Sequence, residues 1–401
     1  MVQKRAVETR QKIVAGLVRV IVQAGLPGVT HRAVAQAAGV SLAATTRHFD
    51  TKDAMLTEVS GQVLAGYLAG LDRLRGRIER GQAPGIARLD DVVALVTRNA
   101  LVRERDLSLA WCELILHGGR SAQGRALARR WFDGIDGHWR AIAATLGDCS
   151  DETDVTIAVD TAVGLLFLLH PFRLQADQVG PLLAGQTTVA ADPGNVVPQD
   201  AAGATGRAHV LAAAIGVLVD QGPQAVSYRA VAERAGLSRS APGYYFATVD
   251  AMLEAAQTAL FARAKDRYRD GFRAHERGRL DAGQLADLTS AIFGREALQY
   301  PQENLAFHSV WVRAAVQDSL RPAIGAALHD QQQAWRQALS SVGAPPANAL
   351  RVQALFVGKL VRAMTAGADL SQTAGAREQF LRAMQKRYSC ANDGAVIGLR
   401  P

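Results

Sequence analysis

Apolar residues recur at the spacing of an α-helix through most of the chain. Over residues 9–24 they stand at positions 13, 14, 17, 18, 20, 21 and 24, one stripe along a helix of about 3.6 residues per turn. Further stripes occupy 92–116, 124–146, 153–170, 285–298, 304–316, 321–341, 347–366 and 376–388. No segment shows the sustained alternation of apolar and polar residues that indicates a strand. The pattern therefore predicts an all-α fold.

One stretch of the chain occurs twice. Residues 29–56 align with residues 226–253 without gaps, at an offset of 197, and fifteen of the 28 positions are identical. The same frame places Arg10 on Arg207. A period this long far exceeds that of a solenoid repeat, so it indicates a duplicated domain.

The repeated stretch has the pattern of a helix-turn-helix. In the first copy Thr30 is a good N-cap for a short helix, and Gly39 suits the left-handed conformation that ends it. Ser41 then caps a third helix that runs to about His48, and Thr51 caps a fourth. The third helix, LAATTRH, is small or polar where a core helix would be apolar. On this local pattern alone it suits a solvated surface helix as well as a helix that reads DNA.

Both copies resemble the N-terminal domain of the TetR family of bacterial repressors. The family pattern runs roughly Thr-x-Arg-x-Ile-Ala-x-x-Ala-Gly-Val-Ser-x-x-x-Leu-Tyr-x-His/Tyr-Phe-x-x-Lys-x-x-Leu. The first copy matches it at Thr30, Arg32, Val34, Ala35, Ala38, Gly39, Val40, Ser41, His48, Phe49, Lys52, Met55 and Leu56. The second copy matches it at Ser227, Arg229, Val231, Ala232, Ala235, Gly236, Leu237, Ser238, Tyr245, Phe246, Met252 and Leu253. The resemblance implies two DNA-binding heads, each followed by a helical body that binds ligands and dimerises.

The resemblance also implies which residues contact DNA. In the first head they are Thr30, Arg32, Ser41, Leu42, Ala43, Ala44, Thr46, Arg47, His48 and Lys52. In the second they are Ser227, Tyr228, Arg229, Ser238, Arg239, Ser240, Ala241, Gly243, Tyr244, Tyr245 and Thr248. For Tyr245, packing of the ring in the core with only the hydroxyl exposed is an equal alternative.

The second head departs further from the family pattern than the first. With Ser238 as N-cap, Pro242 stands at about the fourth position of the reading helix, the edge of what a first turn tolerates. Residues 1–56 carry eight Lys and Arg against three Asp and Glu, a net +5. Residues 203–253 carry four against three, a net +1. We expect the first head to supply more of the attraction to phosphates.

The residues expected to face the DNA groove differ between the copies, whereas the residues that cap, turn and pack the helices are kept. The small and methyl-bearing side chains of Leu42 and Ala43 favour thymine methyl groups, whereas Arg239 at the matching helix favours guanine. Two unlike reading helices predict an operator without palindromic symmetry.

The duplication divides the chain into six predicted segments. They are a first head (1–56), a first body (57–178), a linker (179–206), a second head (207–253), a second body (254–390) and a C-terminal tail (391–401). The most apolar helices, 155–170 and 349–364, occupy equivalent late positions. In the family such helices pair across a dimer, so here they would pair within one chain; each also suits the core of its own half. We expect a monomer that acts as a pseudo-dimer, and a further dimer stays open.

Composition and charge narrow the range of expected partners and cellular compartments. The net charge of +8 is compatible with a polyanion such as double-stranded DNA, although this basicity alone is weak support. Three widely spaced cysteines form neither a disulfide framework nor a zinc spacing, which favours a reducing cytoplasm. The polar N-terminus predicts no signal peptide, and the longest apolar run, 161–169, is too short to span a membrane.

A small apolar or amphipathic effector would bind inside a helical body. Candidate contacts are Trp111, Cys112, His117, Trp131, Phe307, His308 and Trp311. Core packing is the alternative role for each of these side chains. No residue set has the spacing of a metal site, and no motif predicts a cofactor or a catalytic centre.

These observations predict a tandem TetR-like regulator, a ligand-responsive repressor with two different heads. The alternatives are a ligand-binding or protein-interaction module with one or both heads degenerate, and an all-helical enzyme.

Overall fold

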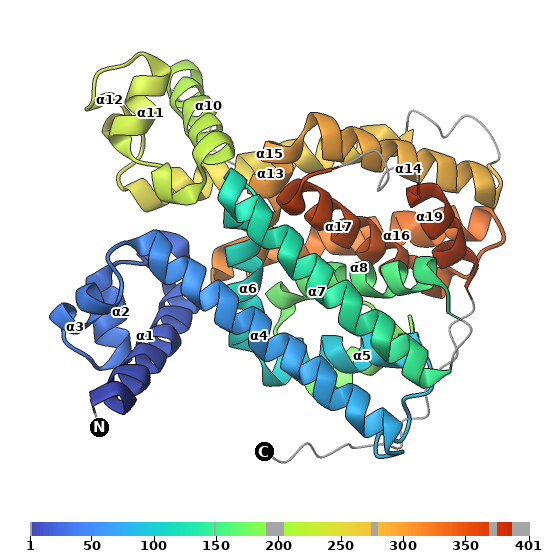
Figure 1. Ribbon diagram of the computed structural model, residues 1–401. Coiled ribbons are helices and arrows are strands. Elements are labelled where there is room, and N and C mark those ends of the chain that lie inside the picture. The colour runs from blue at the N-terminus through green and yellow to red at the C-terminus, as the bar shows by residue number, and fades with distance from the viewer. Residues whose placement is uncertain (1, 148–149, 190–203, 274–279, 369–374, 387–401) are drawn as a thin grey trace.

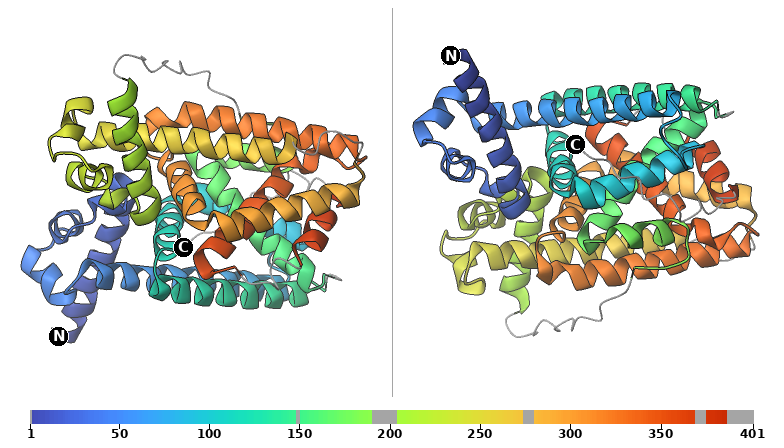
Figure 2. Two further views of the ribbon diagram at one scale, coloured as in Figure 1. Left: turned by 90° about the horizontal axis from the view of Figure 1, so that it is seen from above. Right: turned by 90° about the horizontal axis from the view of Figure 1, so that it is seen from below.

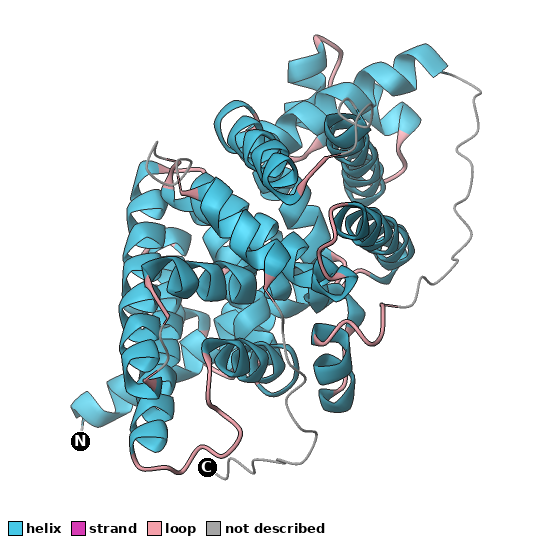
Figure 3. Cartoon of the chain, turned by 90° about the vertical axis from the view of Figure 1, so that its right-hand side faces the viewer, coloured by secondary structure: helices cyan, strands magenta, loops and turns pink. Residues whose placement is uncertain are grey.

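The computed structural model describes residues 2–147, 150–189, 204–273, 280–368 and 375–386. Within these ranges the chain forms helices, turns and loops and no strand, so the all-α prediction is confirmed (Figure 3). Two similar units follow one another along the chain. Their heads lie at the same end of the molecule, and their bodies merge into one helical block (Figures 1 and 2).

The helices of the first unit begin with its head. They are α1 (Val2–Ala24), the turn η1 (Leu26–Gly28), α2 (His31–Ala38), α3 (Leu42–His48) and α4 (Lys52–Glu79). Its body continues with α5 (Leu89–Arg98), η2 (Asn99–Arg103), α6 (Arg105–Gly118), α7 (Ala122–Leu146), α8 (Glu152–Leu169), η3 (His170–Phe172) and α9 (Ala176–Leu183).

The second unit repeats this order. Its head contains α10 (Ala204–Gln221), η4 (Pro223–Ala225), α11 (Tyr228–Ala235), α12 (Ala241–Tyr245) and the start of α13 (Val249–Arg273). Its body continues with α14 (Ala282–Gln299), α15 (Pro301–Arg313), η5 (Asp318–Leu320), α16 (Arg321–Ser341), η6 (Pro346–Asn348), α17 (Ala349–Ala366) and α19 (Ala376–Gln385).

Two helices run without a break from a head into its body. The first is α4, which begins directly after its N-cap Thr51, and the second is α13. The predicted borders after residues 56 and 253 therefore fall inside helices. Motion of a body can reach its own head through one continuous helix.

Two helices extend into the predicted linker, residues 179–206. Helix α9 extends to Leu183, and α10 already begins at Ala204. Gly180 and Pro181 suggest a break, but the buried side chains of Val179 and Leu182 pack α9 against α5. This packing outweighs the hydrogen bond lost at proline. Residues 190–203 and the predicted tail at 391–401 lie outside the described residues.

The centre of the block is a close crossing of α8 and α17 (Figure 1). A Cβ atom on Gly164 would lie 1.8 Å from the carbonyl oxygen of Ala354. On the other helix, a Cβ atom on Gly358 would lie 1.8 Å from the carbonyl oxygen of Asp160. An offset of 194 residues carries Gly164 onto Gly358 and Asp160 onto Ala354, so each contact is the equivalent of the other and the crossing has an approximate twofold symmetry. The late helices therefore pair within one chain, in the way that their equivalent positions predicted.

Helix α8 has the length and apolar character of a membrane-spanning segment. However, 89% of its most apolar window is buried inside the protein. It is therefore a core helix of the body.

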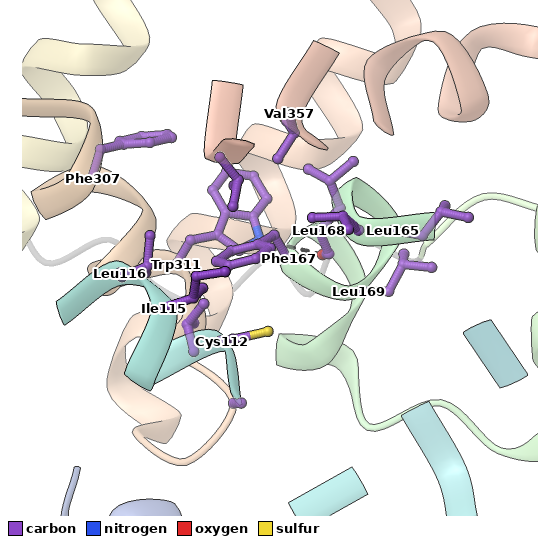
Figure 4. Packing of buried hydrophobic residues seen from close by; sticks show 14 of the residues in the cluster. Cys112, Ile115, Leu116, Leu165, Phe167, Leu168, Leu169, Phe307, Trp311 and Val357 are labelled. Atoms are coloured by element: carbon purple, nitrogen blue, oxygen red, sulfur yellow. Dashed lines mark hydrogen bonds between the residues drawn. The ribbon is translucent and has the colours of Figure 1, made fainter. Parts of the chain in front are cut away.

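Both units contribute side chains to a single core between the bodies. The Trp111 ring lies 6.1 Å from the Phe167 ring, and Phe167 in turn lies 6.1 Å from His308 in the second unit. Trp311 donates its indole N–H to the carbonyl oxygen of Leu168 at 3.2 Å (Figure 4). The two units thus form one folded body rather than two joined domains.

A buried ion network also joins the two units. Arg362 of α17 donates from Nε to the Asp160 carboxylate on α8 at 2.8 Å. Its two terminal nitrogens bind the Asp136 carboxylate on α7 at 2.7 and 2.9 Å. The guanidinium also lies 4.4 Å above the Phe132 ring. Asp160 is fully buried, so its charge depends on cations contributed by the second unit.

Candidate nucleic-acid interface

The first head is built on helix caps that the sequence predicted. The hydroxyl of Thr30 accepts a hydrogen bond from Ala33 N at 3.1 Å, and that of Ser41 accepts one from Ala44 N at 3.1 Å. Gly39 has φ 65°, the left-handed conformation that closes α2 before the turn. The helix-turn-helix geometry therefore follows from local chemistry.

One Arg–Phe contact explains why the repeat extends back to the first helix. The guanidinium of Arg10 lies 5.1 Å above the Phe49 ring, and that of Arg207 lies 4.8 Å above the Phe246 ring. Arg10 also forms an ion pair with Glu58 at 2.7 Å. In each head this contact holds the end of the reading helix against the first helix.

Helix α3 presents most of its predicted contact residues to solvent. Leu42 is 46% exposed, and Ala43, Thr46 and Arg47 are exposed as well. Ala44 and His48 are half-buried. The helix is anchored instead by the fully buried Thr45, whose side chain was not among the predicted contacts. The exposed face is free to enter a DNA groove.

The two basic residues that flank α3 differ in their surroundings. Arg32 at the start of α2 is exposed, and the structure gives it no hydrogen bond or ion pair within the described ranges. Lys52 is half-buried and donates to the carbonyl oxygen of Leu26 at 2.6 Å. Burial lowers the pKa of Lys52, with Asp53 opposing the shift. Lys52 therefore ties the turn η1 to the start of α4.

The reading helix of the second head begins later than the sequence suggests. The predicted N-cap, Ser238, caps nothing; its hydroxyl lies 3.3 Å from that of Ser240, and α12 starts only at Ala241. The cause is Pro242, which is buried and occupies the first turn, where its missing N–H costs no hydrogen bond. The resulting helix has five residues and no side-chain cap.

The three tyrosines of the second head fall into two groups. Tyr228 is half-buried and donates its hydroxyl to the carbonyl oxygen of Phe246 at 2.7 Å. Tyr245 is half-buried and close to α10, where a Cβ atom on Gly206 would lie 2.1 Å from its hydroxyl oxygen. Tyr244 is 83% exposed. Of the three, Tyr244 has the most surface available to DNA.

The remaining candidates of the second head lie mostly at its surface. Arg229, Ser238, Arg239, Ser240, Gly243 and Thr248 are exposed, while Ser227 and Ala241 are half-buried. Two of these hydroxyls act as caps: Ser227 accepts from Ala230 N at 3.2 Å, and Thr248 accepts from Ala251 N at 3.0 Å. The scaffold chemistry of the first head therefore recurs around a shorter reading helix.

The two heads touch each other through equivalent turns, η1 and η4. Arg120 of the first body reaches the second head and donates to the carbonyl oxygen of Val219. Arg313 of the second body lies against Gly25 of the first head, 2.8 Å from the position of a Cβ atom there. Burial raises the pKa of Glu113 on α6 to about 7, with the charge of Arg313 opposing the shift. Sequence reasoning missed these residues because none lies in the repeated stretch.

Part of the predicted effector set lines a narrow pocket in the first body. Trp111 and Trp131, with ring centroids 5.7 Å apart, form one wall. The other lining residues are Ser60, Leu114, Ile115, Gly118, Gly124, Leu127 and Ala128. The indole N–H of Trp111 is buried and has no hydrogen-bond partner in the described structure. Cys112 is fully buried and His117 half-buried, and neither lines this pocket.

The predicted effector residues of the second body lie in the packed core. The rings of Phe307 and Phe261 stack at 5.3 Å. Burial lowers the pKa of His308 to about 4, and its Nδ1 lies 2.8 Å from the carbonyl oxygen of Asn304. Trp311 is held by its bond to Leu168. All three side chains are buried, and their contact with an effector stays a prediction. Among the described residues no His, Cys, Asp and Glu group could hold a metal ion.

Comparison with known proteins matches three parts of the chain. Residues 13–59 and 210–256 each match the model of the bacterial regulatory proteins of the tetR family. Residues 280–386 match a tetracyclin repressor-like C-terminal domain. A search of curated proteins finds no match. Among solved structures, the chain is similar to a protein from Streptomyces coelicolor A3(2) described as a transcriptional regulator. The identity is 21% and the TM-score 0.35, over 45% of this chain and 99% of that one.

The family matches fall on the same segments as the structure and the repeat. Both head matches cover the duplicated helix-turn-helix, and the third covers the second body. The family consists of regulatory proteins, which excludes the all-helical enzyme. The chain belongs to the TetR family of DNA-binding transcriptional regulators and carries two of its helix-turn-helix heads in tandem.

Proposed function

We propose that this regulator is a ligand-responsive repressor whose two heads read two different DNA half-sites. One observation carries the proposal: the two heads keep the same caps on the helices before and after the reading helix but expose different side chains around the reading helix itself. Leu42, Ala43 and Arg47 are exposed on α3, whereas Arg239 is exposed in the turn before α12 and Tyr244 is exposed on α12. We place the protein in the bacterial cytoplasm, at the nucleoid, where it would repress by occupying its operator.

The contact chemistry of the heads supports unlike half-sites. The methyl groups of Leu42 and Ala43 suit thymine methyl groups in the major groove. Arg239 suits the O6 and N7 acceptors of guanine. A single chain that supplies both heads would bind as a monomeric pseudo-dimer, with the heads about 34–36 Å apart for successive major grooves.

The pocket beside Trp111 and Trp131 supports an effector of small size and largely apolar character. Its walls are aromatic and aliphatic, and the unpaired indole N–H of Trp111 would donate to one acceptor on the ligand. Occupation would change the spacing of the heads through α4, which leads from the pocket residue Ser60 to the first head.

A second candidate function is a regulator in which only the first head binds DNA. The short, uncapped α12 and the small net charge of the second head favour it. Replacing Arg239 by alanine separates the two candidates, because the change weakens binding only if the second head contacts DNA.

Arg32→Ala is expected to weaken binding of the selected operator by about 1–3 kcal/mol, the value of a bidentate contact to a base. Arg32 is exposed and has no partner within the described ranges, so its loss leaves the fold intact. Fluorescence anisotropy with labelled duplex measures the change. Arg130→Ala is the matched control, since Arg130 is exposed on α7 in the body. A folded Arg32→Ala protein with wild-type affinity would remove Arg32 from the interface.

A further inference from the structure

The segment 118–124, which joins α6 to α7 of the first unit, is hydrogen-bonded to the second head. Arg120 in this segment donates from Nη1 to the carbonyl oxygen of Val219 and from Nη2 to that of Leu218 at 3.5 Å. Both carbonyls lie in the last turn of α10. Gly222 N satisfies the carbonyl of Leu218 at 3.0 Å, whereas no other donor is seen at Val219 within the described structure. A cation at the negative end of a helix dipole is a favourable placement.

This contact is partly shielded from water. Arg120 is half-buried, and burial lowers its pKa to about 10, with Asp220 opposing the shift. Asp220 itself is engaged by Arg234 at 2.6 Å. The partners of the Arg120 guanidinium are therefore the helix carbonyls of the other unit, and replacing them with water would be costly.

The same segment forms one wall of the tryptophan pocket. Gly118 and Gly124, the first and last residues of the segment, both line the pocket. A Cβ atom on Gly124 would lie 2.1 Å from Gly118 O. Arg125 donates to Gly119 O at 3.1 Å and closes the turn. Gly119 also packs on α17, where its Cβ atom would lie 3.0 Å from Met364 O. Because α17 blocks that side, a ligand that widens the pocket must shift the segment as a whole.

The contact that the second unit makes with the first head differs from the contact that Arg120 makes with the second head. Arg313 at the end of α15 lies against Gly25, but its Nη1 is buried and has no hydrogen-bond partner within the described ranges. Arg313 of the second unit therefore packs against the first head, whereas Arg120 of the first unit is hydrogen-bonded to the second head.

We propose that Arg120 couples the tryptophan pocket of the first unit to the DNA-binding head of the second unit. The coupling rests on the proposed function, in that the heads bind DNA and the pocket binds an effector. A ligand between Trp111 and Trp131 would displace the segment 118–124, withdraw Arg120 from α10 and release the second head. Thermodynamic linkage requires the reverse effect as well: DNA bound at the second head must alter the pocket.

The reverse effect gives a test that needs no known effector. The full chain is titrated with duplex carrying the half-site of the second head, and its intrinsic tryptophan fluorescence is followed. We expect a change that Trp111→Phe reduces and Arg120→Gln abolishes. In hydroxyl-radical footprints on the whole operator, Arg120→Gln should lose about tenfold in affinity at the second half-site and keep the first.

Arg130→Gln on α7 is the matched control and should behave as wild type in both measurements. Equal protection of both half-sites by Arg120→Gln, together with an unchanged fluorescence response, would overturn the coupling while the proposed function stands. Equal weakening of both half-sites would also overturn it, since that outcome indicates a general loss of structure. A wild-type chain that protects no DNA would instead refute the proposed function.

Discussion

Replacing Arg362 by methionine is expected to lower the free energy of unfolding by about 3–5 kcal/mol, the usual cost of removing one partner of a buried ion pair. The substitution leaves the fully buried Asp160 with Lys359 as its nearest cation, at 3.8 Å. It also removes both bonds to Asp136. Chemical denaturation of the full chain measures the loss.

The double variant Asp160→Ala with Arg362→Met provides the control for this expectation. It removes the stranded carboxylate as well as the cation, so it should recover part of the lost stability. A loss below about 1 kcal/mol for the single variant, or a double variant no more stable than the single one, would show that the network does not hold the two units together.

Gly164→Ala is expected to destabilise the protein by about 2–3 kcal/mol, because the added methyl group overpacks the crossing of α8 and α17. The new Cβ atom would lie 1.8 Å from Ala354 O, so the two helices must separate. Thermal unfolding at matched concentration measures the effect. Gly358→Ala on the opposite helix should behave in the same way, because its Cβ atom would lie 1.8 Å from Asp160 O.

A glycine in the same body gives a matched comparison. Gly137 lies within α7, and nothing stands within 4 Å of a Cβ atom placed on it. Gly137→Ala should therefore raise stability by up to about 1 kcal/mol, the difference in helix propensity between the two residues. Equal effects of Gly137→Ala and Gly164→Ala would contradict the close crossing.

Local chemistry made much of the heads predictable from sequence. Thr30, Ser41 and Thr51 act as caps through bonds to backbone groups three residues away, so sequence spacing suffices to find them. The same reasoning failed at Ser238, because a buried proline four residues later sets the start of α12. It also failed at Pro181, where packing on α5 maintains a helix that local preferences oppose.

The contacts between the two units could not be predicted from the sequence. Arg120, Asp160 and Arg362 find their partners about a hundred or more positions away, and no repeat or motif marks them. Aromatic residues posed a related difficulty: Trp111 lines a pocket and Trp311 fills the core, although both belong to equivalent helices. Only the packing of neighbouring helices separates these roles.

The central claim is that one chain reads two unlike half-sites. It is tested most directly by selecting bound duplexes from random DNA with the full-length protein. We expect an operator without inverted symmetry, with a G·C pair at the base that Arg239 meets. Exchanging residues 41–48 with 238–245 should then select the same half-sites in the opposite order. A clean inverted repeat would contradict the claim and would indicate that two chains bind, each through one competent head.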